Sequence, residues 1–375
     1  MTRRKPRIRF QIQPTVSHYR EPLVRRLRES SRFAYDLVGR FKNSEAQAAD
    51  AILSASEDTL QAVEPTGTAT AGLLWWEKGQ VAAVWCGDHE AYVLEGRVYT
   101  VSAWVAGAVG KLRGRRVLLW GHGWKRPEGG LKRKLRLGFY RLVDGLMVYG
   151  DQARELGISY GVPQEKIRVV YNSLYSGKQL PETSVRGSKP GERPVLIYSS
   201  RLTSRHRLDL LAEALRDWPE AQKPLVVVVG EGSERPRLEG VFDQAGVDAE
   251  FLGAVYDFDR LKALYSGADL ALSIGGAGLN VIQALGFGVP VLAEAGHRDS
   301  SPEIEAVVES ETGRYYEAGS ATSLREVLLE LLASPEELQQ MGARGLQLIR
   351  RRYTAEAHAE AIENALEHFL QQNPA

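Results

Sequence analysis

The sequence predicts an α/β protein with two Rossmann-like domains, each a parallel sheet covered by helices. Short apolar runs alternate along the chain with stretches of helical periodicity, a pattern typical of parallel strands joined by crossover helices. A stretch rich in Pro, Gly and Ser at residues 176–194 interrupts this pattern near the middle. The 375 residues also suit two domains, since a domain usually has about 100–200 residues.

The expected elements follow one another along both halves of the chain. The first half begins with a strand at residues 7–13 and a helix at residues 17–31. Further strands are expected there at residues 34–40, 91–98, 115–121, 145–150 and 167–172. In the second half, strands are expected at residues 195–200, 225–230, 249–253, 269–275 and 290–296, separated by helices at residues 207–218, 233–246 and 279–287 and by the segment 260–268.

These elements group into one domain at residues 1–180 and a second at residues 190–354. We expect the last helix, at about residues 355–375, to pack back on the first domain. Ligands of open α/β sheets bind beyond the carboxyl ends of the strands. The sequence therefore predicts a ligand site in a cleft between the two domains.

The charges of the chain cancel overall but are unevenly distributed. There are 48 Lys and Arg against 47 Asp and Glu, and the first 141 residues carry +12 whereas the rest carry −11. The positive charge lies in residues 1–40 and 111–141, which indicates a basic surface on the first domain. No nucleic-acid recognition module accompanies these clusters, so we do not expect nucleic acid as a partner.

Cysteine content and hydropathy indicate a cytoplasmic protein. Cys86 is the single cysteine, so neither a disulfide within the chain nor a Cys-based zinc site is expected. The basic start of the chain lacks the apolar stretch of a signal peptide. No run approaches the roughly 18–20 apolar residues that a membrane-spanning helix needs.

Glycine-rich turns that follow strands are candidates for a nucleotide site. The apolar run at residues 225–229 leads into Gly230 and Gly232, where the backbone can approach a ligand closely, although such turns are also common without one. A second turn, before a helix that begins near Leu279, contains Gly275, Gly276 and Gly278. The free amides and positive dipole end of that helix suit a diphosphate.

Four motifs of the second half occur in the order in which a known family has them. They are Ser200–His206, Gly230–Arg235, Phe251–Val255 and Tyr265–Leu270. With them, the region from about residue 194 to residue 375 resembles the nucleotide-binding domain of the GT-B glycosyltransferases, in particular the retaining enzymes of family 4. The resemblance implies a GT-B fold, in which two Rossmann-like domains face each other across a cleft, and a nucleotide sugar bound by the second domain.

Three positions depart from the family pattern. The family's paired glutamates fall on Gly275 and Gln283, and its lysine falls on His206, with Arg205 beside it as a substitute cation. Gln283 still offers a hydrogen-bond donor and an acceptor, whereas Gly275 has no side chain. These departures leave the donor sugar open and motivate one alternative hypothesis, a non-catalytic nucleotide-sugar-binding partner of another transferase.

Three further patterns resemble a subgroup of these enzymes encoded in polysaccharide-biosynthesis clusters. They are Trp120–Gly123, Gly275–Leu279 and His297–Glu303. Together they favour an active, divergent transferase. His122 follows an apolar strand and lies between two glycines, so we expect it at the carboxyl end of that strand as a donor-sugar contact. A structural role is the alternative for this lone histidine.

The resemblance implies a site with residues from both domains and neither metal nor cofactor. Catalytic roles are expected for His122, Arg201 and His206. The residues expected to bind the donor are Arg205, Gly230, Gly232, Val255, Gly275, Gly276, Gly278, Leu279, Asn280 and Gln283. Those expected on the acceptor side are His18, Arg20, Lys125 and Arg126, although an ordinary helix start explains the first two equally well. The arginines, with His206 and the amides at Gly278–Asn280, would neutralise charge on the departing diphosphate.

We therefore expect a hexosyltransferase-like enzyme of cell-surface polysaccharide synthesis. It would move a sugar, with retention, from a UDP- or GDP-linked donor to a hydroxyl of a glycan or lipid-linked saccharide. No Asp-x-Asp motif or His/carboxylate cluster indicates a metal. The third hypothesis is a GT-B-type nucleotide-sugar 2-epimerase, which would need acidic catalytic residues that the sequence does not clearly provide.

The basic segment 125–141 is a candidate membrane contact. Lys132, Arg133 and Arg136 alternate in it with leucines, as in a helix that lies on an anionic bilayer. Each cation near such a surface contributes about 1 kcal/mol. We expect peripheral binding at the inner face of the membrane through this basic half, with Trp75 and Trp76 in the protein core.

Overall fold

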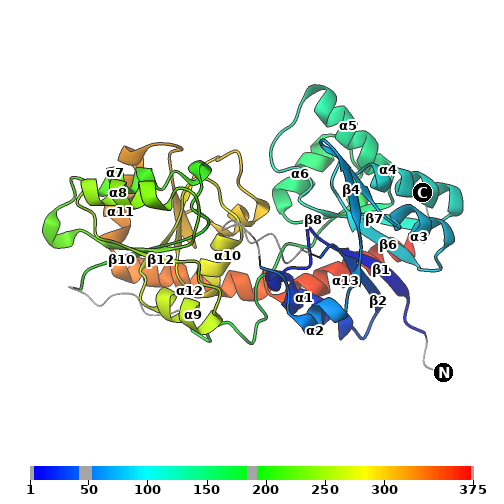
Figure 1. Ribbon diagram of the computed structural model, residues 1–375, viewed down its shortest axis with the longest axis horizontal. Coiled ribbons are helices and arrows are strands. Elements are labelled where there is room, and N and C mark those ends of the chain that lie inside the picture. The colour runs from blue at the N-terminus through cyan, green and yellow to red at the C-terminus, as the bar shows by residue number, and fades with distance from the viewer. Residues whose placement is uncertain (1–3, 42–52, 184–191, 373–375) are drawn as a thin grey trace. The chain divides into compact units, whose positions relative to one another are not determined.

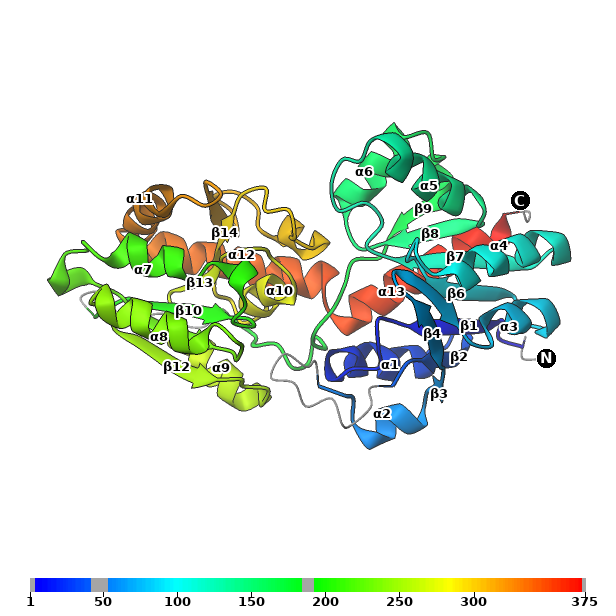
Figure 2. The ribbon, with the colours of Figure 1, turned by 45° about the horizontal axis from the view of Figure 1, so that its top comes forward.

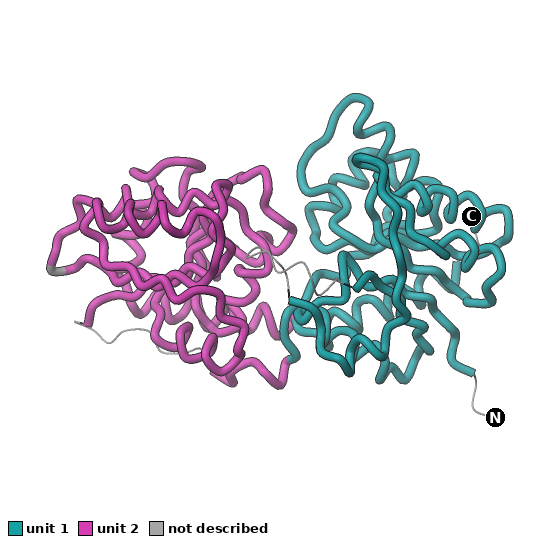
Figure 3. Tube along the Cα trace, viewed as in Figure 1, with its two compact units in different colours: residues 1–46, 52–176, 354–375 teal, residues 47–51, 177–353 magenta. Residues whose placement is uncertain are grey.

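The computed structural model describes residues 4–41, 53–183 and 192–372 (Figure 1). The chain divides into two compact units, coloured separately in Figure 3. The first comprises residues 1–46, 52–176 and 354–375, and the second comprises residues 47–51 and 177–353. The predicted break at residues 176–194 includes residues 184–191, which lie outside the described residues.

The first unit is built on a parallel sheet in the order β3-β2-β1-β6-β7-β8-β9. Its strands are β1 (Arg7–Ile12), β2 (Ala34–Gly39), β3 (Glu64–Pro65), β6 (Ala91–Glu95), β7 (Arg116–Gly121), β8 (Gly145–Val148) and β9 (Ile167–Val169). The chain first adds strands on one side of β1 and then continues on the other, beginning with β6. The reversal between β1 and β6 is the position where open α/β sheets hold their ligands, beyond the carboxyl ends of the strands.

Helices cover both faces of this sheet, which is why β6 and β8 are buried along their whole length. The helices are α1 (Glu21–Arg28), α2 (Glu57–Gln61), α3 (Gln80–Cys86), α4 (Val101–Arg113), α5 (Gly130–Arg141), α6 (Asp151–Ser159) and α13 (Ala355–Gln371), with short 3-10 turns at His18–Arg20 and Gln164–Lys166. Phe10 and Trp120 pack in the core cluster that includes residues of α1 and α13, whereas Tyr92 and Leu119 pack in the cluster that includes residues of α4, α5 and α6. The helices themselves can be followed in Figure 2. The last helix therefore completes the core of the first unit.

A hairpin that the sequence did not predict inserts between β3 and α3. Its antiparallel strands are β4 (Thr68–Ala71) and β5 (Leu74–Glu77). Alternate residues of β5 face opposite ways: Glu77 is buried, whereas Trp76 is 39% exposed. The expectation that both tryptophans lie in the core is therefore wrong for Trp76.

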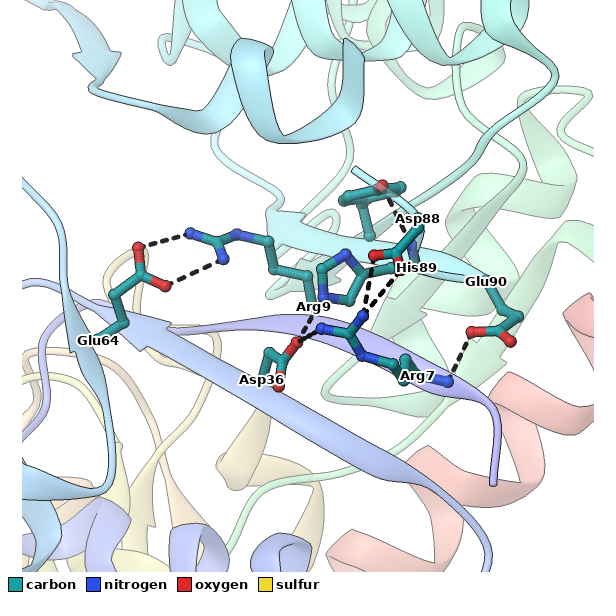
Figure 4. Close-up of polar contacts among 8 residues, drawn as sticks. Arg7, Arg9, Asp36, Glu64, Asp88, His89 and Glu90 are labelled. Atoms are coloured by element: carbon teal, nitrogen blue, oxygen red, sulfur yellow. Dashed lines mark hydrogen bonds and ion pairs between the residues drawn. The ribbon is translucent and has the colours of Figure 1, made fainter. Parts of the chain in front are cut away.

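Charged side chains near the amino ends of β1, β2 and β6 form a cluster of ion pairs (Figure 4). Arg7 contacts Asp36 at 2.7 Å and Asp88 at 2.9 Å, and His89 Nε2 lies 2.6 Å from Asp36. Arg9 pairs with Glu64 at 3.0 Å. Part of the positive charge of residues 1–40 is therefore neutralised within the unit.

The second unit is a parallel sheet in the order β12-β11-β10-β13-β14-β15, again with one reversal, between β10 and β13. Its strands are β10 (Val195–Ser199), β11 (Leu225–Val229), β12 (Ala249–Gly253), β13 (Leu270–Ser273), β14 (Val291–Glu294) and β15 (Gly313–Tyr316). Its helices are α7 (Asp209–Leu215), α8 (Arg235–Gln244), α9 (Phe258–Ser266), α10 (Leu279–Gly286), α11 (Ala321–Leu332) and α12 (Pro335–Arg352), with short 3-10 turns at Ser204–His206, Glu220–Gln222 and Pro302–Ala306. Two parallel sheets with covering helices confirm the predicted fold class.

Candidate functional site

The loops after β10 and β13 meet at the strand-order reversal of the second unit. A Cβ atom at Gly275 would lie 2.3 Å from the carbonyl oxygen of Arg205 and 2.3 Å from Cα of His206. The backbone φ of Gly275 is +72°, a conformation that favours glycine. The position where the family has a glutamate therefore has no room for a side chain, because the loop after β10 occupies that space.

The loop after β11 packs equally closely against the loop after β10. A Cβ atom at Gly230 would lie 1.9 Å from the carbonyl oxygen of Ser200, and one at Gly232 would lie 2.1 Å from that of Leu202. Leu202 N also donates to Glu231 O at 2.9 Å. The predicted glycines thus bring the ends of adjacent strands together. This role is structural.

Two exposed arginines and one buried histidine follow β10. Arg201 and Arg205 are exposed, whereas His206 is buried. His206 Nδ1 lies 2.9 Å from Thr203 Oγ1, and Arg205 Nε donates to His206 Nε2 at 3.2 Å. Burial, together with the charges of Arg205 and Arg201, lowers the pKa of His206 to about 4. His206 is therefore neutral near pH 7 and orients Arg205, so Arg205 is the better substitute for the family's lysine.

The turn that precedes α10 already uses much of its own hydrogen-bonding capacity. Gly275 N donates to Glu294 at 2.8 Å, Ala277 N to Ser300 Oγ at 3.1 Å, and Gly278 N to Asn280 Oδ1 at 2.8 Å. Among the described residues, nothing accepts from the amides of Gly276 and Leu279. Only some of the amides that were predicted to bind a diphosphate are thus available. The amide of Gly278 could do so only if its hydrogen bond to Asn280 Oδ1 were broken.

Two other residues predicted to bind the donor lie in α10 and after β12. Gln283 Oε1 accepts from Ser199 Oγ at 3.2 Å and from the Tyr265 hydroxyl at 3.3 Å, so the side chain connects α10 to the end of β10. Val255 is buried, two residues after the end of β12. His297, which the site prediction omitted, packs against Gly276. A Cβ atom at Gly276 would lie 2.9 Å from His297 Nδ1. Its sequence signal was the His297–Glu303 pattern.

In the first unit, His122 lies directly after β7, as predicted from its glycine neighbours. Its ring packs edge-on against Tyr149, with 5.1 Å between the centroids. Burial and the charges of Lys125 and Arg20 lower the pKa of His122 to about 3. Near neutral pH this side chain is therefore an uncharged hydrogen-bonding group.

Arg20 occupies a central position at the carboxyl edge of the same sheet. Its guanidinium donates to Gln13 O at 2.9 Å, to Asn172 Oδ1 at 2.8 Å and to the Tyr149 hydroxyl at 3.0 Å. Only 2% of Arg20 is exposed. This geometry fits a residue that positions the segments after β1, β8 and β9, and it does not fit the predicted direct contact with an acceptor. Sequence reasoning missed Tyr149 and Asn172, because nothing in their spacing points to Arg20.

The other predicted acceptor-side residues flank this edge. His18 Nδ1 lies 3.4 Å from Leu53 O, and burial lowers the pKa of His18. Lys125 and Arg126 are exposed in the segment between β7 and α5. Their exposure leaves these two cations accessible, whereas His18 is half-buried.

The basic helix differs in two respects from the prediction for residues 125–141. It begins only at Gly130. Arg136 is half-buried and donates to Glu128 at 2.8 and 3.0 Å and to Gly123 O at 3.1 Å. Arg136 therefore fixes the segment after β7 to the helix and is not a surface cation. The exposed cations of α5 are Lys132, Arg133, Lys134 and Arg141, and the first three lie beside Leu131, which is 82% exposed, and Leu135, which is 45% exposed.

Comparison with known proteins agrees with this architecture. Residues 181–348 match the family model described as Glycosyl transferases group 1. The chain is 28% identical over 196 residues to a GDP-mannose-dependent α-(1-6)-phosphatidylinositol monomannoside mannosyltransferase of Mycobacterium tuberculosis. That match covers 48% of this chain and 48% of the relative. The chain thus spans about half the length of the curated relatives it matches.

Solved structures extend the likeness of the fold to nearly the whole chain. The lipopolysaccharide outer core galactosyltransferase WaaB superposes with a TM-score of 0.72 at 12% identity, over 96% of this chain and 99% of that chain. Anabaena HepE in complex with UDP superposes with a TM-score of 0.68 at 16% identity, with the same coverage. The whole chain therefore has the two-domain fold of the GT-B glycosyltransferases. The match to the Glycosyl transferases group 1 model falls within its second unit.

Proposed function

We propose that the protein is a glycosyltransferase that takes its sugar from a nucleotide diphosphate donor held by the second unit. The observation that carries this proposal is the strand-order reversal between β10 and β13, where two close-packed glycine turns and the exposed Arg201 and Arg205 lie at the carboxyl ends of the strands. Positive side chains and free backbone amides at such a position suit a diphosphate. The family match over residues 181–348 supports the same reaction class.

In this proposal, electrostatic stabilisation of the leaving group is the main catalytic effect. Arg201 and Arg205 neutralise charge that develops on the departing diphosphate, and the amides of Gly276 and Leu279 donate hydrogen bonds to it. His206 acts indirectly, because its Nε2 atom holds Arg205 in place. Transfer proceeds without a metal and with retention at the anomeric carbon, as the family 4 resemblance implies. His122 contributes as a neutral hydrogen-bonding group.

A nucleotide panel tests this proposal directly. We expect UDP, GDP or their sugar conjugates to raise the melting temperature of the protein, since a ligand that binds only the folded state stabilises it. Nucleotide release from the best sugar conjugate then measures donor cleavage. Absence of any thermal shift across the panel, with correctly folded protein, would refute nucleotide-sugar binding and with it the proposed function.

The acceptor and the membrane form the second part of the proposal. The mycobacterial relative is named for a lipid acceptor, and α5 presents the exposed Lys132, Arg133 and Lys134 beside the exposed Leu131 and Leu135. We propose a lipid-linked or glycan acceptor and peripheral binding of α5 to an anionic bilayer. No helix of the described residues is long and apolar enough to cross a membrane. Sedimentation with vesicles of phosphatidylcholine, with and without phosphatidylglycerol, tests the contact: binding that ignores the anionic lipid would exclude it.

A non-catalytic nucleotide-sugar-binding protein is the second candidate, and one observation favours it. The family's first glutamate is replaced by Gly275, whose side-chain space is filled by the backbone of Arg205 and His206. A carboxylate side chain therefore cannot be placed at that position. Tight nucleotide binding without donor cleavage or transfer would support this candidate, whereas conversion of the sugar without nucleotide release would indicate an epimerase.

A further inference from the structure

The segment that follows β6 presents an arginine at the strand-order reversal of the first unit. Gly96 N donates to Trp120 O at 2.8 Å, which fixes this segment beside the end of β7. Arg97 comes next, and its guanidinium carbon lies 3.9 Å from the centroid of the Trp75 ring. Trp75 belongs to the unpredicted hairpin, so the hairpin supplies a platform for this cation at the edge where open α/β sheets bind ligands.

Arg40, next to Arg97, differs from it in having ion-pair partners. Arg40 lies 5.0 Å from the same Trp75 ring, is buried, and pairs with Glu77 at 3.2 Å and with Glu95 at 2.7 Å. Arg97 is half-buried and, within the described part of the chain, its side chain makes no hydrogen bond or ion pair. Its rigid fork of five N–H donors is therefore held in place by stacking, with those donors still unused.

Two buried carboxylates lie within electrostatic range of Arg97, and Arg40 and a helix end oppose their negative charge. Burial raises the pKa of Glu77 and of Glu95, and the charges of Arg40 and Arg97 oppose that shift. Both carboxylates are buried and Arg40 is paired with each of them. The amino end of α4 begins four residues after Arg97, and Thr100 N donates to Arg97 O at 3.0 Å. The positive end of that helix dipole adds to the charge of Arg97.

We propose that Arg97, stacked on Trp75, binds an oxyanion carried by the acceptor, a phosphate or a carboxylate. A guanidinium fork matches both groups by paired hydrogen bonds. The assignment of the anion to an acceptor rests on the proposed function, whereas anion binding at Arg97 does not. The phosphate would come from a lipid-linked acceptor and the carboxylate from a glycan that contains a uronic acid.

Nuclear magnetic resonance of isotope-labelled arginine side chains in the full chain tests the site. The Arg97 signal is assigned by its loss in Arg97→Gln, and the protein is titrated with inorganic phosphate and, separately, with glucuronate at constant ionic strength. We expect a saturable shift of the Arg97 signal with one or both probes. A phosphate response indicates a phosphorylated acceptor, and a glucuronate response indicates a uronic acid. If neither probe moves the signal beyond what chloride does, the proposal is wrong.

Arg113 provides a matched control within the same unit. It also stacks on an exposed tryptophan, Trp85, at 5.1 Å, but it lies at the other end of α4. We expect its signal to stay unchanged with both probes. Equal responses of Arg97 and Arg113 would indicate non-specific attraction and overturn the site.

A second variant separates the guanidinium fork from the charge alone. Arg97→Lys keeps the cation, so it should fold, but it loses the paired hydrogen bonds. Followed in both proteins at the indole N–H of Trp75, it should bind the responsive probe about tenfold or more weakly than the wild type. Unchanged affinity would contradict recognition by the fork. Nucleotide binding, measured by thermal shift on the same variant, should stay at the wild-type level. Failure of nucleotide binding in the wild type would instead count against the proposed function.

Discussion

The two units present different kinds of surface at the corresponding point of their sheets. In the second unit, the reversal between β10 and β13 is lined by glycines whose neighbours leave no room for side chains. In the first unit, the reversal between β1 and β6 is surrounded by large side chains, among them Arg40, Trp75 and Arg97. Backbone amides can bind a group that many donors share, such as a diphosphate. Side chains can be varied from enzyme to enzyme, so they are better able to recognise different acceptors.

The largest expected effect comes from adding a side chain to the glycine edge. Gly275→Ala places a Cβ atom within 2.3 Å of backbone atoms of Arg205 and His206, at a φ of +72°. We expect a loss of about 1–3 kcal/mol in the free energy of unfolding, together with loss of nucleotide binding. Thermal melting and nucleotide titration measure the two effects.

Gly296→Ala is the matched control for this crowding. Gly296 has a similar φ of +62°, but nothing lies within 4 Å of its Cβ position. The Gly296→Ala substitution therefore strains the left-handed backbone but causes no clash, and nucleotide binding should persist. Equal damage by the two substitutions would show that close packing at Gly275 is not what shapes the edge.

Removing one cation from the same edge should have a smaller effect on stability. Arg201→Ala is expected to weaken nucleotide diphosphate binding by about tenfold or more, because a charged hydrogen-bond donor is lost. The melting temperature should stay unchanged, since Arg201 is exposed. Arg216→Ala, another exposed arginine of this unit, serves as the control. Wild-type affinity in Arg201→Ala would remove Arg201 from the site.

The buried imidazole of His206 predicts a pH dependence of stability. Its pKa falls from 6.5 to about 4 in the folded protein. Between these values the unfolded state binds more protons than the folded state, so stability decreases as the pH falls from 6.5 to 4. We expect His206→Asn to flatten this part of the profile of unfolding free energy against pH. An unchanged slope would show that His206 is not buried as a neutral group.

The smallest effect is expected from Glu77 in the first unit, and its sign is opposite. Burial raises the pKa of Glu77 from 4.5 to about 7. The folded state then holds a proton that the unfolded state has released, so stability declines as the pH rises from 4.5 to 7. Glu77→Gln should therefore gain in melting temperature relative to the wild type across this range. A difference that stays constant with pH would contradict the assignment.

The sequence predicted the fold far better than the burial and hydrogen-bond partners of the polar side chains. Apolar runs located the strands of both sheets except β3 and β15, and placed His122 directly after β7. The hairpin β4–β5 was missed, because one face of it is exposed and Trp76 resembles a core residue in the sequence. The periodicity of apolar residues indicates whether a segment is buried, but it does not indicate which face of an inserted hairpin packs against the protein.

The roles of the site residues were harder to predict, because they depend on partners distant in the sequence. Arg20 is held by Tyr149 and Asn172, which lie more than a hundred residues further along the chain. His206 was expected to act as a cation, but it is buried and accepts a hydrogen bond from Arg205. No spacing rule shows that a histidine is enclosed, because enclosure results from how separate loops pack.

The amides of the turn before α10 have a thermodynamic consequence. In this turn, Gly275, Ala277 and Gly278 already donate to Glu294, Ser300 and Asn280. An anion that recruits Gly278 replaces an existing hydrogen bond and gains only the difference between the two. Free phosphate gains little from such an exchange, whereas a complete nucleotide adds contacts of its base and ribose. In the proposed function, the turn would therefore favour a whole nucleotide diphosphate over an inorganic anion.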